Sequence, residues 1–215
     1  MEVVLIPGLG GDRRLFKNLQ FKNCNYTVLE FTEPLKNESL TAYCKRIVHE
    51  ISGNKEIVLI GVSLGGIIAQ ELSKLIDVKK IILISSIKSS NGKPWYYLIA
   101  KIFPFYRVIP DSLFKWLCAI LSPLFGTKTK EDRLLYQQML RSSTANFLKW
   151  GVKAVLNWEQ QDTIPNTVLI HGNKDHIFPV RFVKPDHLIE GGQHFMIVQK
   201  PAEIMEIVNK ILLQT

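Results

Sequence analysis

The sequence predicts an α/β fold, with a mostly parallel, doubly wound sheet of about six strands and an inserted helical segment. Short runs of continuous apolar residues alternate with segments whose apolar residues recur at helical spacing. Strands without a polar face are typical of parallel sheets that helices cover on both sides. The alternation is lost over residues 88–161, where helical patterns follow one another without a strand. We therefore expect a core, residues 1–87 and 162–215, and a cap segment, residues 88–161.

Six runs along the chain predict the strands. The first, Val3–Ile6, is wholly apolar and ends at Pro7 and Gly8, which favour a tight loop. Ile57–Ile60 is also fully apolar. The other runs are Tyr26–Phe31, Lys80–Ile84, Thr167–Ile170 and, as a weaker last one, His187–Glu190.

Four segments of the core predict helices. In the second of them the apolar residues fall at positions 40, 43, 44, 47, 48 and 51, the spacing of a helix with one buried face. The last one begins with Pro201, at a first-turn position where the missing N–H costs little. The four segments are Arg13–Leu19, Ser39–Ile51, Leu64–Leu75 and Pro201–Leu213.

The composition excludes several classes of protein. With 47% hydrophobic and 21% charged residues, the 215-residue chain is neither disordered nor fibrous. The three cysteines, Cys24, Cys44 and Cys118, lie far apart, which argues against a disulfide framework or a cysteine zinc site. The N-terminal residues run straight into a strand, without the basic start of a secretory signal. We therefore expect a cytoplasmic protein.

The net charge of +8 is concentrated in the cap segment. Residues 88–161 carry eleven Lys and Arg against four Asp and Glu, a balance of +7, whereas the rest carries sixteen against fifteen. A solvated basic face is the simplest interpretation; the alternatives are a patch that steers anionic ligands and a membrane or nucleic-acid surface. Charged residues and prolines interrupt every apolar window, so none reaches the roughly 18–20 residues of a membrane-spanning helix.

The most informative motif is Gly61-Val62-Ser63-Leu64-Gly65, which lies between a predicted strand and a predicted helix. This context is the one that a Gly-x-Ser-x-Gly nucleophile elbow requires. A sharp strand-to-helix turn exposes the Ser63 hydroxyl, and side chains at either glycine would clash. The N–H of Leu64, at the positive end of the helix, is then free to bind an oxyanion. The alternative is an ordinary glycine-rich packing turn.

A serine nucleophile needs a base, itself oriented by an acid. Of the five histidines, His194 is best placed, in a glycine-rich loop between the last strand and the final helix; the others are His49, His171, His176 and His187. Asp175 follows the preceding strand at the same edge of the sheet. Its competitors are Asp162, which precedes its strand, and Asp186, which comes just before the last strand. The chain order Ser63, Asp175, His194 is that of hydrolases with this elbow.

The loop Pro7–Asp12, after the first strand, supplies a second oxyanion donor. Its glycines allow close approach to a ligand, and the N–H of Leu9 is the candidate. A glycine-rich loop here also suggests nucleotide binding, but a Gly-x-Gly-x-x-Gly motif and a P-loop lysine with its serine are both missing.

Together these motifs resemble the α/β-hydrolase fold family, and in detail small bacterial serine hydrolases with a helical cap. The resemblance covers residues 1–87 and 162–215. It implies that Ser63 is the nucleophile, Asp175 the acid and His194 the base, with the backbone of Leu9 and Leu64 as oxyanion donors. The chain would begin at the family's third strand, which implies six strands, all parallel.

Two departures from the family pattern matter. Pro7-Gly8 replaces the usual His-Gly of the oxyanion loop, so any role of that histidine is lost. Only eighteen residues separate Asp175 from His194, which implies that the helix usually found there is reduced to a turn around Val180–Phe182.

We expect a serine hydrolase that cleaves a carboxylic ester or thioester through an acyl-enzyme on Ser63. Carbon–carbon bond hydrolysis or a lyase reaction in the same site, a non-catalytic ligand receptor, and a lipase that docks on membranes through its cap are the alternatives. The expected partner is a small acyl substrate, and the basic cap favours an anionic one; neither nucleic acid, metal nor cofactor is implied. Cap aromatics form the expected substrate wall, with Trp95, Phe103 and Trp116 as candidates.

Overall fold

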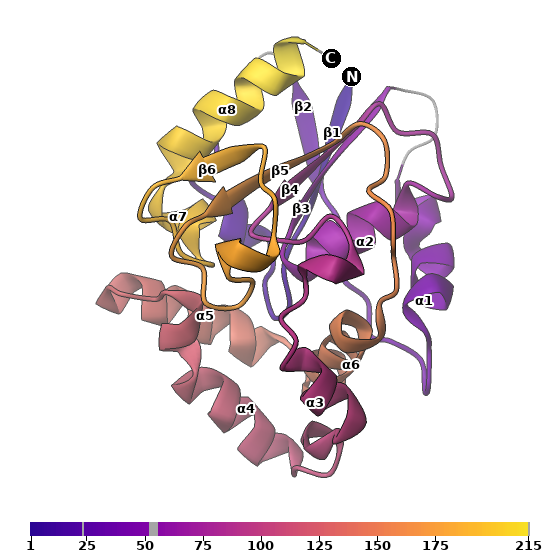
Figure 1. The fold of residues 1–215 in the computed structure, drawn as a ribbon, viewed down its shortest axis with the longest axis vertical. Helices are drawn as coiled ribbons and strands as arrows, with labels where there is room; N and C mark the ends of the chain where they lie inside the picture. Colours follow the sequence, from indigo (N-terminus) through magenta and orange to yellow (C-terminus); the bar gives the residue numbers. More distant parts are fainter. Residues whose placement is uncertain (23, 52–55, 215) are drawn as a thin grey trace.

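A six-stranded parallel sheet forms the centre of the protein (Figure 1), whose computed structural model describes residues 1–22, 24–51 and 56–214. The strand order is β2-β1-β3-β4-β5-β6, and every neighbouring pair is parallel. The strands are β1 (Glu2–Ile6), β2 (Asn25–Val28), β3 (Ile57–Val62), β4 (Lys80–Ile84), β5 (Thr167–Gly172) and β6 (His187–Ile189). The α/β class and the parallel, doubly wound sheet predicted from the sequence are confirmed.

Helices cover both faces of the sheet, which explains why its strands are apolar throughout. Successive side chains of β1 point to opposite faces, so Val4 and Ile6 pack against α1 (Leu40–Ile47) and α2 (Leu64–Leu72). Val3 and Leu5 pack instead with the apolar side of α8 (Pro201–Leu213). All the residues of β1 and β3 are buried.

Several elements end elsewhere than the sequence predicts. The first predicted helix, Arg13–Leu19, is only a 3₁₀ helix, Arg13–Phe16, because so short a segment forms too few hydrogen bonds to offset the cost of helix nucleation. The strand expected at Tyr26–Phe31 is the edge strand β2 and stops at Val28, where its pairing with β1 ends. Both α1 and α2 close with tight turns, so they are shorter than predicted, whereas β3 and β5 each continue by two residues.

The cap segment contains four helices that lie beyond the carboxyl ends of the strands (Figure 1). They are α3 (Tyr97–Ile102), α4 (Asp111–Ile120), α5 (Lys130–Ser142) and α6 (Ala145–Asn157), with short 3₁₀ helices between them. The chain then returns to the sheet through β5, β6 and the short helix α7 (Met196–Gln199). Both chain ends lie at the opposite end of the molecule.

Candidate active site

Ser63 occupies the turn between β3 and α2, in a backbone conformation that side chains rarely adopt, with φ 53° and ψ −119°. The turn brings the backbone of Gly65 against Gly61, where a Cβ would overlap it. A Cβ on Gly65 would in turn overlap the carbonyl groups of Ile6 and Pro7. The two glycines of the motif are therefore required by the close approach of three backbone segments.

The side chains of Ser63, His194 and Asp175 form one continuous hydrogen-bonded chain. His194 Nε2 lies 2.9 Å from Ser63 Oγ, and His194 Nδ1 lies 2.8 Å from Asp175 Oδ2. With a proton on Nδ1 donated to the carboxylate, Nε2 is left to accept the proton of the serine hydroxyl. His194 and Asp175 are only 5% and 3% exposed, so water competes little for these bonds.

Backbone groups hold the Asp175 carboxylate in place. Its Oδ1 accepts hydrogen bonds from the N–H groups of Ile177 (2.8 Å) and Phe178 (2.9 Å), which leaves Oδ2 to His194. Burial raises the pKa of Asp175, but the charge and hydrogen bond of His194, together with His171 and the Phe178 N–H, outweigh burial and hold this pKa below its ordinary value. The carboxylate therefore stays ionised beside the imidazole.

Strand pairing explains how Asp175 and His194 meet across so few residues. The last residues of β5 and β6, Gly172 and Ile189, are register partners, so the loops that follow them emerge side by side. The Lys174 N–H donates to Gly192 O at 2.8 Å and ties the two loops together. The connection between the strands contains only a 3₁₀ helix, Val180–Phe182, where the sequence predicts a turn.

The two proposed oxyanion donors flank Ser63. Leu64 is the first residue of α2, so its N–H has no partner within the helix, and no side chain caps this end. Within residues 1–22, 24–51 and 56–214, no loop hydrogen bond uses the N–H of Leu9 or of Leu64. Leu9 and Ser63 also line the same cavity.

The family model for alpha/beta hydrolases matches residues 3–207 of this chain. The chain belongs to the alpha/beta hydrolase family. No curated protein sequence matches it.

Solved structures of similar fold carry several enzyme names. An esterase from Thermogutta terrifontis is 14% identical, with 100% of this chain and 90% of that one covered and a TM-score of 0.70. A bromoperoxidase from Bacillus anthracis is also 14% identical, with 99% and 91% covered and a TM-score of 0.68. YbtT, the type II thioesterase of the yersiniabactin pathway, is 16% identical, with 99% and 91% covered and a TM-score of 0.64. At these identities the likeness shows the shared fold.

In this alpha/beta hydrolase a small apolar cavity of about 50 Å³ adjoins the serine and the oxyanion loop. Besides Ser63, His194 and the loop around Leu9, its lining includes Leu15, Val62, Phe125, Tyr136, Met139 and Ile197. Three of these, Phe125, Tyr136 and Met139, come from the cap segment. The cap therefore supplies one wall of the cavity, as a substrate-binding cap would.

The aromatic residues expected to form that wall lie elsewhere. Trp95, Phe103 and Trp116 are 57–68% exposed, and none of them lines the cavity at Ser63. The reason is packing: α4 turns Phe114 inward toward α5 and α6, which leaves Trp116 on its outer side. The cavity uses Phe125 and Tyr136 instead, whose rings lie 5.4 Å apart.

The cap is fastened to both loops of the hydrogen-bonded chain. The Phe195 N–H, next to His194, donates to Phe125 O at 2.8 Å, and the Phe125 ring meets the imidazole edge-on at 5.6 Å. On the acid side, the Tyr97 hydroxyl donates to Ile177 O at 2.8 Å. Two cap segments thus help to hold the loops of His194 and Asp175.

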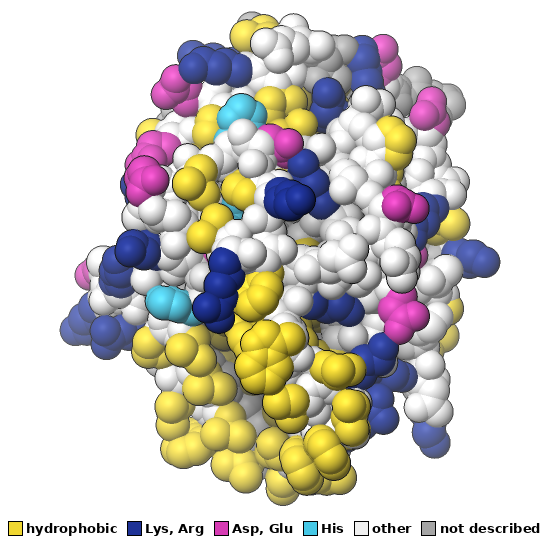
Figure 2. Space-filling model, in the orientation of Figure 1, with side chains coloured by type: hydrophobic (Ala, Val, Ile, Leu, Met, Phe, Trp, Pro, Cys, Tyr) yellow, Lys and Arg dark blue, Asp and Glu magenta, His cyan; other side chains and the backbone are white. Residues whose placement is uncertain are grey.

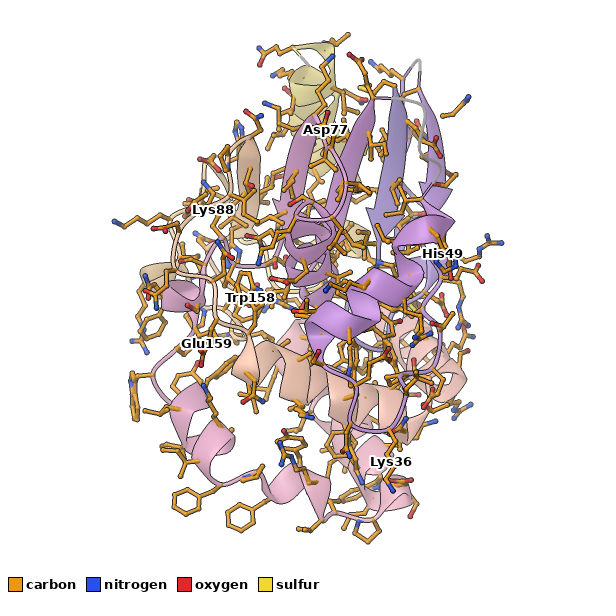
Figure 3. The ribbon with its side chains drawn as sticks, turned by 90° about the vertical axis from the view of Figure 1, so that its right-hand side faces the viewer. Lys36, His49, Asp77, Lys88, Trp158 and Glu159 are labelled. Atoms are coloured by element: carbon orange, nitrogen blue, oxygen red, sulfur yellow. The ribbon has the colours of Figure 1, made fainter. Side chains whose placement is uncertain are left out.

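The other acids and histidines considered in the sequence take no part in this chain. Asp186 pairs with Lys88 at 2.6 Å and accepts the Leu169 N–H, so its role is to brace β5 and β6. Asp162 is exposed in the segment before β5. Figure 3 shows His49 near the end of α1, on the opposite flank of the molecule from Lys88.

His171 is the residue near the site whose role the sequence alone does not indicate. It is fully buried at the end of β5, with Nε2 2.7 Å from Phe178 O and 3.6 Å from Asp175 Oδ2. The Nε2–H donates to that carbonyl and so fixes the loop whose N–H groups hold Asp175. Its position at the carboxyl end of a strand, four residues before Asp175, is the signal that could have drawn attention to it.

We expect His171 to make the folded protein sensitive to mild acid. Burial lowers its pKa below the ordinary value of 6.5, although Asp175 and the Phe178 carbonyl oppose this. Below pH 6.5 the unfolded chain then binds a proton that the folded chain does not. Stability is complete above this pH and falls as the pH drops toward the folded pKa, by at most about 1.4 kcal/mol per pH unit.

Urea unfolding at pH 7.5 and 5.5 checks this expectation. His171→Gln, which retains a donor toward Phe178 O, should flatten the loss of stability between the two pH values. The exposed-histidine control, His49→Gln, should leave it unchanged. If wild type and His171→Gln lost the same free energy of unfolding between the two pH values, His171 would not be the source of the acid sensitivity.

Proposed function

We propose that this protein is a serine hydrolase that cleaves a carboxylic ester or thioester through an acyl-enzyme on Ser63. One observation carries the proposal: the uninterrupted hydrogen bonds from Ser63 through His194 to Asp175, at 2.9 and 2.8 Å. Together with two backbone donors beside the serine, this arrangement meets the requirements of a nucleophile, a base, an orienting acid and an oxyanion site.

Catalysis would proceed in two halves. His194 Nε2 takes the Ser63 proton as Oγ attacks the substrate carbonyl, and the N–H groups of Leu9 and Leu64 hold the oxyanion that forms. Asp175 stabilises the resulting imidazolium, which gives its proton to the departing alcohol or thiol as the acyl bond breaks. A water molecule then attacks the acyl-enzyme and gives a proton to His194. As the bond between the acyl carbon and Ser63 Oγ breaks, the imidazolium returns this proton to Oγ, and the acid is released.

The cavity beside Ser63 supports a short, apolar acyl group. Its volume is about 50 Å³, and one water molecule needs roughly 10–15 Å³ by the same measure. Leu15, Tyr136 and Met139 line it, and an acyl chain of few carbons would fill a volume of this size. The alcohol or thiol side of the substrate would lie outside this cavity.

Met139→Ala should shift the preference of the enzyme toward longer acyl chains. The change removes the end of a side chain that lines the cavity, so the ratio of kcat/KM for hexanoyl over acetyl p-nitrophenyl esters should rise by about tenfold or more. Met205→Ala, in a buried methionine of α8 outside the cavity, is the matched control and should leave the ratio unchanged. Equal shifts in both variants would mean that this cavity does not hold the acyl chain.

Two separate experiments test the proposal: labelling with a fluorophosphonate, and trapping of the acyl-enzyme on unlabelled protein. The probe should modify Ser63, and a rapidly quenched p-nitrophenyl butyrate reaction should yield a peptide butyrylated at Ser63 with one equivalent of released p-nitrophenolate. A receptor of the same fold would show neither burst nor turnover. Turnover without an acyl-enzyme would favour a lyase or another chemistry in this site.

A further inference from the structure

The outer side of the cap is covered by exposed apolar side chains. Of nineteen large hydrophobic residues exposed in the described part of the chain, twelve lie between positions 95 and 124. We call this set the outer cap face: Trp95, Leu98, Ile99, Ile102, Phe103, Phe105, Val108, Leu113, Trp116, Ile120, Leu121 and Leu124. Figure 2 shows hydrophobic side chains gathered at the end of the molecule formed by α3 and α4. Such a contiguous apolar surface marks an interaction site.

The outer cap face follows the helical period. On α4, Leu113, Trp116 and Ile120 are exposed, whereas Phe114 is buried on the inner side. The same spacing occurs in α3 and the residues just before it, where Trp95, Leu98, Ile99 and Ile102 are all 54–68% exposed. Both helices therefore turn apolar side chains outward, while α4 also turns Phe114 inward and no residue of α3 is buried.

The exposed charge of the cap segment is positive. Arg107, Lys128, Lys130, Arg133 and Arg141 are exposed and form no ion pair with the described residues.

The acids of the cap do not neutralise this charge. Asp111 pairs with Lys149 and Glu159 with Lys101, each at 2.7 Å, while Asp132 is buried and accepts from Gln199. Glu131 is the exposed exception. The unpaired charged residues on the cap surface are therefore mostly cationic.

We propose that the outer cap face docks on the surface of an anionic phospholipid bilayer. Aromatic side chains are favoured at the membrane interface, and helices with one apolar side and basic neighbours lie in it. Anionic headgroups complement the cap charge, whereas a second copy of this chain would bring two segments of +7 together. None of the helices in the described ranges is long and apolar enough to cross a bilayer.

Docking of this kind would also bring the cap wall of the cavity at Ser63 close to the membrane. The segment that carries the outer cap face also supplies Phe125, Tyr136 and Met139 to the cavity at Ser63. The proposal does not depend on the hydrolase activity, because the outer cap face contains none of Ser63, Asp175 and His194.

Vesicle flotation of the full chain carrying Ser63→Ala tests the docking without turnover of lipid. The protein should float with vesicles of phosphatidylcholine and phosphatidylglycerol and remain behind with phosphatidylcholine alone. Ile102→Gln with Trp116→Gln should weaken partition at least tenfold. Leu188→Gln with Leu213→Gln, which changes two exposed leucines of the core, should not weaken it.

Charge is tested separately with a matched pair of triple variants. Each basic residue near an anionic surface strengthens partition about fivefold, so Arg107→Gln, Lys128→Gln and Lys130→Gln together should weaken it about 100-fold. Lys17→Gln, Lys22→Gln and Lys45→Gln, at exposed lysines of the core, should have little effect. Thermal unfolding confirms that each variant is folded.

Three results would overturn the proposal. One is the absence of flotation with anionic vesicles, and another is equal weakening by cap and core variants. The third is that the protein binds no vesicles but forms a dimer in solution, and that the double variant Ile102→Gln with Trp116→Gln dissociates this dimer. The outer cap face would then bind a second copy of the chain.

Discussion

Replacing Ser63 by alanine is expected to lower kcat for a p-nitrophenyl ester by about 10⁶-fold, the size of effect known for the nucleophile of another serine hydrolase. His194→Ala should cost about as much, because serine and histidine act as one unit and neither works without the other. The hydrogen bond between them, 2.9 Å from Oγ to Nε2, is the contact that both changes remove. Steady-state rates with purified protein at neutral pH give the comparison.

A serine outside the site provides the control for this experiment. Ser73 follows α2, where its hydroxyl donates to Gln70 O, so Ser73→Ala should retain wild-type kcat. The double variant of Ser63 and His194 should be no slower than either single one. A Ser63→Ala enzyme that kept a hundredth or more of the activity would show that another group attacks the carbonyl.

Asp175→Asn is expected to lower kcat by about 10⁴-fold while the fold is retained. An amide in place of Oδ2 cannot stabilise the imidazolium, and its N–H₂ group would hold His194 in the wrong tautomer. The contacts of Oδ1 with the N–H groups of Ile177 and Phe178 can persist, so the melting temperature should stay close to that of the wild type although kcat falls. Rate and melting temperature are measured on the same preparation.

Asp186→Asn separates the role of Asp175 from a general effect of removing a carboxylate near the site. Asp186 braces the strands through Lys88 and the Leu169 N–H and has no contact with His194. Its substitution should lower stability but leave kcat within a few-fold of wild type. If Asp186→Asn lost as much activity as Asp175→Asn, the acid would have been wrongly assigned.

Much of the core follows directly from the sequence. Runs such as Val3–Ile6 and residues 81–84 have no polar face, and only a sheet covered on both sides buries such runs completely. The position of Ser63 is equally local, because Gly61 and Gly65 are required by the sharp turn itself. Parallel strands end at one edge, which is why loops distant in the chain were expected to bring Asp175 and His194 to Ser63.

The cap shows the limit of this reasoning. Its local pattern predicts helices, but whether an aromatic residue faces the cavity or the outside depends on how the helices pack on the core. The structure turns Trp116 outward and brings Tyr136 to the cavity. An apolar residue that faces outward has the same helical spacing as one that faces a core.

The sequence by itself therefore determined the fold, the turn that carries Ser63 and the loops that carry Asp175 and His194, because these depend on local backbone geometry and on strand direction. Only the tertiary structure decided the lining of the cavity, the support that His171 gives to the Asp175 loop and the exposure of the apolar cap. These features depend on contacts between segments far apart in the chain, which no local pattern of residues specifies.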